Sequence, residues 1–122
     1  MHINFRSKQY SLGVALPTPY DDDFNVDFDS LQNIIEFNIS QGVRYFIVLG
    51  TTAETPLLSL DEKIQIVRFV ADQVSGRVPL VLGLGGTSPQ QLCQEFKVFP
   101  SEEYQAVLCV TPYYIRPSQK GL

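Results

Sequence analysis

Histidine and cysteine, two residues that commonly bind metals, are scarce in this chain. It has one histidine, His2, and two cysteines, Cys93 and Cys109. The cysteines have neither a zinc-ligand spacing nor a CxxC spacing, so we expect two buried, reduced thiols. Three consecutive aspartates at 21–23 are expected to form a solvated turn, because neighbouring carboxylates cannot all face one ion unless the loop curls around it. These features give no indication of a metal centre.

Clustered positive charge and long apolar segments are also lacking. The net charge is −4 and there is no basic block, which makes nucleic acids and anionic membranes poor partners. The apolar runs fall far short of the roughly 20 residues that a helix needs to span a bilayer. Residues 1–10 lack the apolar core of a signal peptide, so we interpret them as an N-terminal extension and expect a cytoplasmic protein.

The sequence does contain enough apolar material for one domain, which we assign to residues 11–122. Of its 122 residues, 44% are hydrophobic and 18% are charged, which is typical of a folded globular protein. Apolar side chains at helical spacing predict a helix over 28–41. Asp27 or Asp29 can cap its start, and Gly42 is a natural end.

Two further helices can be recognised from their starts. Ser59 and the glutamate three residues later match a capping box, which predicts a helix from there to Gly76. Ser88, followed by a proline, predicts the start of another helix, with Leu92, Phe96 and Phe99 facing inward. Apolar runs predict the strands, which are residues 12–16, 43–49, 78–82 and 104–110.

Strands and helices therefore alternate, with about 30 residues between successive strand starts, which is the period of βαβ units. The predicted class is α/β, with four parallel strands and three helices. Two architectures share this order: an open doubly wound sheet and a TIM barrel. A barrel needs eight such units, so four strands and three helices would supply about half of one.

Polar and glycine-rich segments follow the predicted strands. In both architectures ligands bind at the carboxyl ends of the strands, so these segments are expected to meet at one rim. Backbone N–H groups of Thr51 and Thr52 can bind a carboxylate or phosphate, although a βα turn that only caps its own helix fits equally well. We expect Glu54 to hold this loop by accepting backbone N–H bonds rather than to act as a base. The glycines at 83–86 do not fit the dinucleotide fingerprint.

The loop at 111–116 is the most informative segment, because two phenols and a guanidinium follow a strand. Neighbouring side chains point apart, so one of Tyr113 and Tyr114 is expected to pack and the other to face the rim. A phenol can relay protons if it hydrogen-bonds to another hydroxyl. Arg116 either holds an acidic substrate or is solvated.

Taken together, these segments resemble the dihydrodipicolinate synthase branch of the N-acetylneuraminate lyase family. The resemblance runs from about Leu12 to Leu122. Its markers are GVALPTP at 13–19, GTTAE at 50–54 and PYYIRPSQKGL at 112–122. The third is the most specific, and it favours the dihydrodipicolinate synthases over the sugar-acid aldolases.

The resemblance implies a (β/α)₈ barrel enzyme that needs no metal or organic cofactor. A lysine forms a Schiff base with pyruvate, and the enamine attacks aspartate-semialdehyde, as in lysine and diaminopimelate biosynthesis. Thr51 would be the hydroxyl of a proton relay, and Thr51 and Thr52 would bind the pyruvate carboxylate. Tyr114 would be the relay tyrosine that reaches into the neighbouring subunit of a homo-oligomer.

The chain departs from the family pattern at Ala53, where the family has glycine, and before the fourth strand, where a small Ala-Gly run is usual. The family's Schiff-base lysine lies further downstream than Tyr114. Lys8, Lys63, Lys97 and Lys120 do not sit at apolar strand ends, so none is assigned that role. We therefore expect an inactive N-terminal fragment of such an enzyme. The alternatives are a non-catalytic binding or assembly module and a sugar-acid aldolase.

Overall fold

The computed structural model describes residues 12–114 and 118–121. The predicted N-terminal extension, and Arg116 with its predicted role, lie outside these residues. Four strands, β1 (Gly13–Ala15), β2 (Tyr45–Val48), β3 (Leu80–Leu84) and β4 (Ala106–Cys109), alternate with the helices α1 (Phe28–Ser40), α2 (Leu60–Val74) and α3 (Pro89–Phe96). All strand pairs are parallel, and the sheet order is β1-β2-β3-β4. The prediction of four parallel strands with three helices is confirmed.

The helices begin where the sequence predicts. Asp27 caps α1, accepting a bond of 2.9 Å from the Ser30 N–H. Ser59 and Glu62 form the predicted capping box at α2, in which the Glu62 carboxylate accepts from the Ser59 N–H at 2.7 Å. Gly42 follows α1 with φ 84° and Gly76 follows α2 with φ 72°, as predicted for helix ends.

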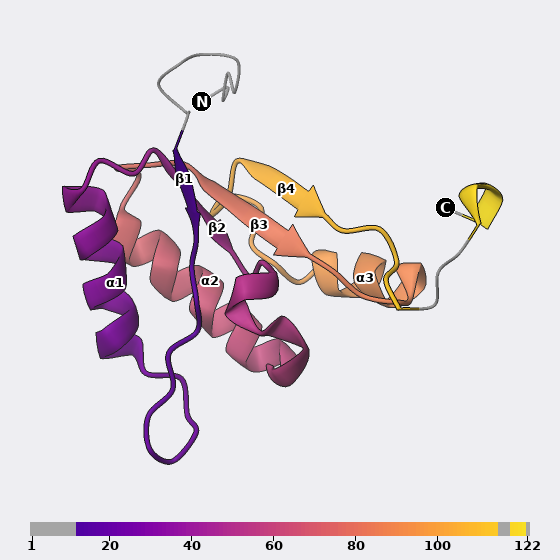
Figure 1. Cartoon of the computed structure of the whole chain (residues 1–122), viewed down its shortest axis with the longest axis horizontal. Helices are drawn as coiled ribbons and strands as arrows, with labels where there is room; N and C mark the ends of the chain where they lie inside the picture. The colour runs from indigo at the N-terminus through magenta and orange to yellow at the C-terminus, as the bar shows by residue number, and fades with distance from the viewer. Residues whose placement is uncertain (1–11, 115–117, 122) are drawn as a thin grey trace.

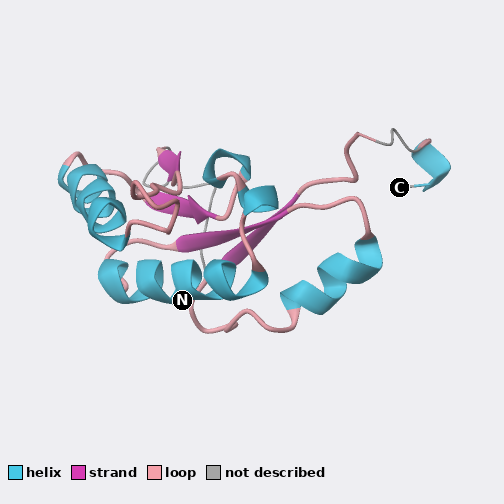
Figure 2. Ribbon diagram, turned by 90° about the horizontal axis from the view of Figure 1, so that it is seen from below, coloured by secondary structure: helices cyan, strands magenta, loops and turns pink. Residues whose placement is uncertain are grey.

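The core lies between the sheet and the first two helices. Figure 1 shows α1 and α2 at the end of the molecule that carries β1 and β2, and α3 at the end that carries β4. Figure 2 shows α2 and α3 lying along one side of the strands. The largest fully buried side chains come from both layers: Phe46, Leu31, Ile35, Leu82, Val67, Val70 and Val74. All five residues of β3 are buried, as expected for a parallel strand with neighbours on both edges. Its start is two residues later than predicted.

The opposite end of the sheet is much less covered. Val107, Leu108 and Cys109 of β4 are exposed, and α3 contains no buried residue. Cys93 is exposed as well, so the prediction of two buried thiols is wrong. The physical reason is that β4 pairs only with β3 and, among the described residues, no element packs over its outer side.

The side chains of α3 are also more exposed than the sequence predicts. Leu92 is half-buried, whereas Phe96 is 41% exposed and does not face the core as predicted. Phe99, which follows the helix, is buried, as predicted.

Candidate functional site

A cavity of about 210 Å³ lies at the carboxyl ends of β2, β3 and β4. Its walls come from the segments that follow these strands, as the sequence predicts for the rim. The lining residues are Leu49, Gly50, Thr51, Thr55, Pro56, Gly83, Leu84, Gly85, Leu108, Val110 and Tyr113. The mixture of apolar walls with a hydroxyl and a phenol is typical of a small-molecule site.

The floor of this cavity is the backbone that leaves β2. Leu49 adopts φ 58°, which turns the chain sharply at the end of the strand. This turn lies directly on β3, since a Cβ at Gly83 would stand 2.5 Å from the Leu49 carbonyl oxygen. Glycine at 83 therefore permits the close approach of the two backbones.

A short 3₁₀-helix, Thr51–Ala53, follows this turn. Its first internal bonds run from the Ala53 N–H to the Gly50 carbonyl at 3.0 Å and from the Glu54 N–H to the Thr51 carbonyl at 3.1 Å. The N–H groups of Thr51 and Thr52 precede these donors, so they have no acceptor within the helix. Thr51 and Thr52 are both exposed, and of the two only Thr51 lines the cavity.

The two tyrosines take different positions. Tyr113 lines the cavity beside Gly85, with its ring carbon Cε1 3.7 Å from where a Cβ would be at that glycine. Tyr114 has φ 73° and is 92% exposed. The structure therefore brings Thr51 together with Tyr113, and it directs Tyr114 outward from this chain. Sequence reasoning did not single out Tyr113, because the divergence of adjacent side chains does not say which one faces inward.

Glu54 points away from this cavity. Its backbone is left-handed, with φ 54°, and its side chain lines a separate cavity of about 320 Å³ with Tyr20 and Glu62. Burial, followed by the charges of Glu54 and Glu62, raises the pKa of the Tyr20 phenol. Over the part of the chain that the structure describes, no backbone N–H donates to the Glu54 carboxylate. The prediction that this carboxylate holds the loop is therefore wrong.

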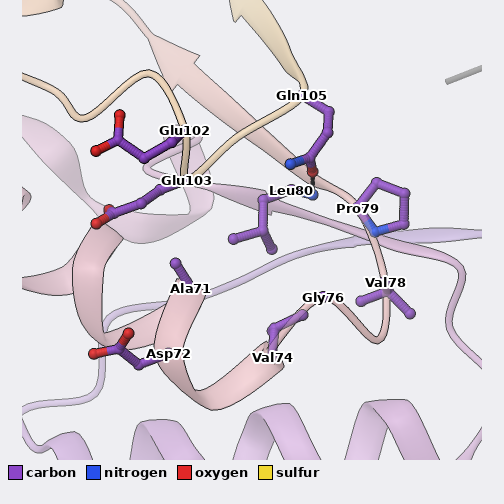
Figure 3. A pocket seen from close by; sticks show the side chains of 10 residues that line it. All are labelled: Ala71, Asp72, Val74, Gly76, Val78, Pro79, Leu80, Glu102, Glu103 and Gln105. Carbon is purple, nitrogen blue, oxygen red and sulfur yellow. Dashed lines mark hydrogen bonds between the residues drawn. The ribbon is translucent and has the colours of Figure 1, made fainter. Parts of the chain in front are cut away.

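A third cavity, of about 220 Å³, lies at the opposite end of the strands, around the start of β3 (Figure 3). There the Leu80 N–H donates to the Gln105 side-chain carbonyl at 2.8 Å. Burial raises the pKa of the Glu103 carboxyl, one of whose oxygens is buried without a partner among the described residues. This end is remote from the strand tips and carries none of the predicted site residues.

Within the described residues, no three histidine, cysteine or acidic side chains are grouped in a way that could hold a metal ion. No helix in those same residues is long and apolar enough to cross a membrane.

The family model of the dihydrodipicolinate synthetase family matches residues 9–122, which include the strand ends described above. The chain belongs to this family. It is 46% identical over 110 residues to the 4-hydroxy-tetrahydrodipicolinate synthase of Flavobacterium psychrophilum, covering 90% of this chain and 38% of that protein. It is 42% identical to the enzyme of the same name from Parabacteroides distasonis, covering 91% of this chain and 37% of that protein.

Solved structures give the same result. The chloride-inhibited dihydrodipicolinate synthase from Acinetobacter baumannii, complexed with pyruvate, is similar with a TM-score of 0.84 and 34% identity, over 90% of this chain and 38% of that chain. A monomeric dihydrodipicolinate synthase variant is similar with a TM-score of 0.83 and 33% identity, over 90% of this chain and 36% of that chain. The four strands and three helices match the N-terminal half of the TIM barrel of these dihydrodipicolinate synthases. The chain thus spans less than two fifths of the length of these relatives.

Proposed function

We propose that this chain is the N-terminal part of a 4-hydroxy-tetrahydrodipicolinate synthase, a lyase that condenses pyruvate with aspartate-semialdehyde through a lysine Schiff base. The observation that carries the proposal is the cavity at the strand ends, where Thr51 and Tyr113 lie together. Membership of the dihydrodipicolinate synthetase family supports the same reaction.

In this proposal the turn after β2 binds the keto acid. The N–H groups of Thr51 and Thr52, which lack acceptors within their 3₁₀-helix, would donate to the pyruvate carboxylate. The Thr51 hydroxyl would pass a proton to a neighbouring phenol. Pyruvate and aspartate-semialdehyde need no metal or organic cofactor for this chemistry.

Tyr114 would contribute its phenol to the proton relay in the site of a second subunit. Its ring is 92% exposed on this chain, which suits a residue that reaches into a partner's site in a homo-oligomer. Tyr113 would instead form part of the wall of its own cavity. The expected location of the enzyme in the cytoplasm stays a prediction.

The nucleophilic lysine would lie beyond this chain. Of the described lysines, Lys63 is paired with Glu95, while Lys97 ends α3 and Lys120 lies in a short 3₁₀-helix near the C-terminus. None of these three lines the cavity of Thr51. The 122-residue chain alone would therefore be inactive.

Borohydride trapping tests both parts of the proposal. The complete gene product that carries this chain is expected to gain the mass of a reduced pyruvate adduct, whereas the 122-residue chain is not. A Thr51→Val variant of the complete product should lose about two orders of magnitude or more in turnover, the usual contribution of a positioned proton-transfer group. An adduct on a lysine of the short chain would overturn the assignment of the nucleophile. Turnover of sugar-acid substrates in place of aspartate-semialdehyde would favour the sister aldolase activity.

A further inference from the structure

We infer that Thr18 is a positioning residue that fixes the turn carrying Thr51 and Thr52; this inference rests on the function proposed above. Thr18 is 6% exposed. Among the residues that the structure describes, no other polar or charged residue is buried. Its hydroxyl donates to the Ala53 carbonyl at 2.8 Å, joining two segments that are 35 residues apart in the chain.

The Ala53 carbonyl depends on this hydroxyl because the backbone offers it no donor. Continuation of the 3₁₀-helix would require an N–H three residues later, but that residue is Pro56. The next N–H, that of Leu57, donates to the Glu54 carbonyl at 2.9 Å. Ala53 is itself only 2% exposed, so solvent has little access to replace the missing donor.

The two prolines beside Thr18 restrict the backbone conformation from which its hydroxyl donates. Pro17 and Pro19 fix their own φ angles, and a proline also restricts the residue before it to extended conformations. Threonine is branched at Cβ, so few side-chain rotamers remain. The segment after β1 thus holds the hydroxyl in a defined direction toward the turn after β2.

The turn needs such a restraint because its geometry is unfavourable in isolation. Leu49 and Glu54, which flank the 3₁₀-helix on both sides, have positive φ angles of 58° and 54°. Thr51 and Thr52 lie between these two residues and immediately before Ala53. Loss of the Thr18 bond would therefore let the two N–H groups that we assign to the carboxylate drift from their positions.

The experiment compares Thr18→Val with Thr18→Ser in the complete gene product. Valine keeps the shape of threonine and removes the hydroxyl, whereas serine keeps the hydroxyl. We expect Thr18→Val to raise the KM for pyruvate about tenfold, with a smaller change in kcat, and to speed hydrogen exchange at the Ala53 and Glu54 amides by a similar factor. Thr18→Ser should restore both values to near those of the unsubstituted protein.

The inference is overturned if Thr18→Val leaves exchange and KM unchanged, or if Thr18→Ser is as impaired as Thr18→Val. Should Thr18→Val fail to fold, the same measurements on Thr18→Ala and Thr18→Ser isolate the hydroxyl, and equal values for these two variants reject its role. Failure of the proposed function has a different signature, because the unsubstituted protein would then form no pyruvate adduct. Hydrogen exchange reports on the Thr18 bond in either case.

Discussion

Gly83 lies so close to Leu49 that a Cβ on the glycine would stand 2.5 Å from the leucine's carbonyl oxygen. The obstructing atoms are backbone atoms of Leu49 and Gly50, which cannot move aside as the end of a long side chain can. The position of the turn that carries Thr51 is therefore tied to the absence of a side chain on the neighbouring strand.

Gly83→Ala is accordingly expected to lower the free energy of unfolding by about 1–3 kcal/mol, as overpacking of a tight site usually does. It should also weaken pyruvate binding, since the turn after β2 must shift. Urea denaturation and a pyruvate titration measure these effects. Gly85→Ala is the matched control. Gly85 lines the same cavity, but a Cβ there would lie 3.7 Å from its nearest neighbour, which is an ordinary van der Waals contact. Equal effects of the two substitutions would contradict this account.

Gly42→Ala separates backbone strain from crowding. Gly42 has φ 84°, and a Cβ there would have nothing within 4 Å. The left-handed conformation alone should therefore lower the free energy of unfolding by about 1 kcal/mol. Thermal or urea denaturation measures the loss, and Gly42→Asn should recover part of it, because asparagine tolerates this conformation better than alanine. A Gly42→Ala variant as stable as the unsubstituted protein would disprove the strain.

Glu103 should make stability fall as pH rises. Burial raises the pKa of its carboxyl, the nearby Arg68 opposes the shift, and the charges of Glu102 and Asp72 add to it. The folded protein therefore holds this proton more tightly than the unfolded chain does. The stabilising contribution is complete below the ordinary glutamate pKa, and it is lost as the pH rises through the higher pKa of the folded state.

Glu103→Gln removes this titration, so the free energy of unfolding should depend less on pH above about pH 4.5 than in the unsubstituted protein. Urea denaturation at a series of pH values measures the slope. Asp72→Asn, which removes one of the charges that raise this pKa, should reduce the slope only in part. An identical pH profile for the Glu103→Gln variant would show that the carboxyl titrates normally.

Lys63 and Glu95 join α2 to α3 through an ion pair of 3.3 Å between Nζ and Oε2, with side chains 16% and 21% exposed. Because α3 has no buried residue, we expect this contact to contribute to its attachment beside the apolar contacts of Leu92 and Phe96. A double-mutant cycle with Lys63→Met and Glu95→Gln should give a coupling energy on the order of 1 kcal/mol that decreases with added salt. Lys97→Met, at the end of the same helix, should change stability by less than about 0.5 kcal/mol. A coupling energy of zero would assign the attachment of α3 to its apolar contacts.

The parts of the fold that were predicted correctly depend on local chemistry. Asp27 and Ser59 mark helix starts because a side chain there must satisfy N–H groups a few residues away. The start of β3 was misplaced because its apolar run extends beyond the residues that pair with β2, whose register is set by contacts distant in sequence. The exposure of Cys93 and Phe96 could not be predicted, because an apolar pattern does not reveal whether any element covers it.

In the candidate site, too, some features could be predicted from the sequence and others could not. Thr51 was identified because a polar turn after a buried strand is expected at the rim. The choice of Tyr113 over Tyr114 for this cavity depends on the left-handed backbone of Tyr114, and the direction of the Glu54 carboxylate depends on its own positive φ angle. Neither conformation is encoded in residue type, since both residues usually avoid it.

The order of the strands across the sheet is the same as their order along the chain. Each strand after β1 therefore pairs with the one that leaves the ribosome before it, and within the residues that the structure describes no pairing waits for a distant segment. A nascent chain can add one strand and its helix at a time, so the turn bearing the threonines can form on β3 while the ribosome is still translating what comes after.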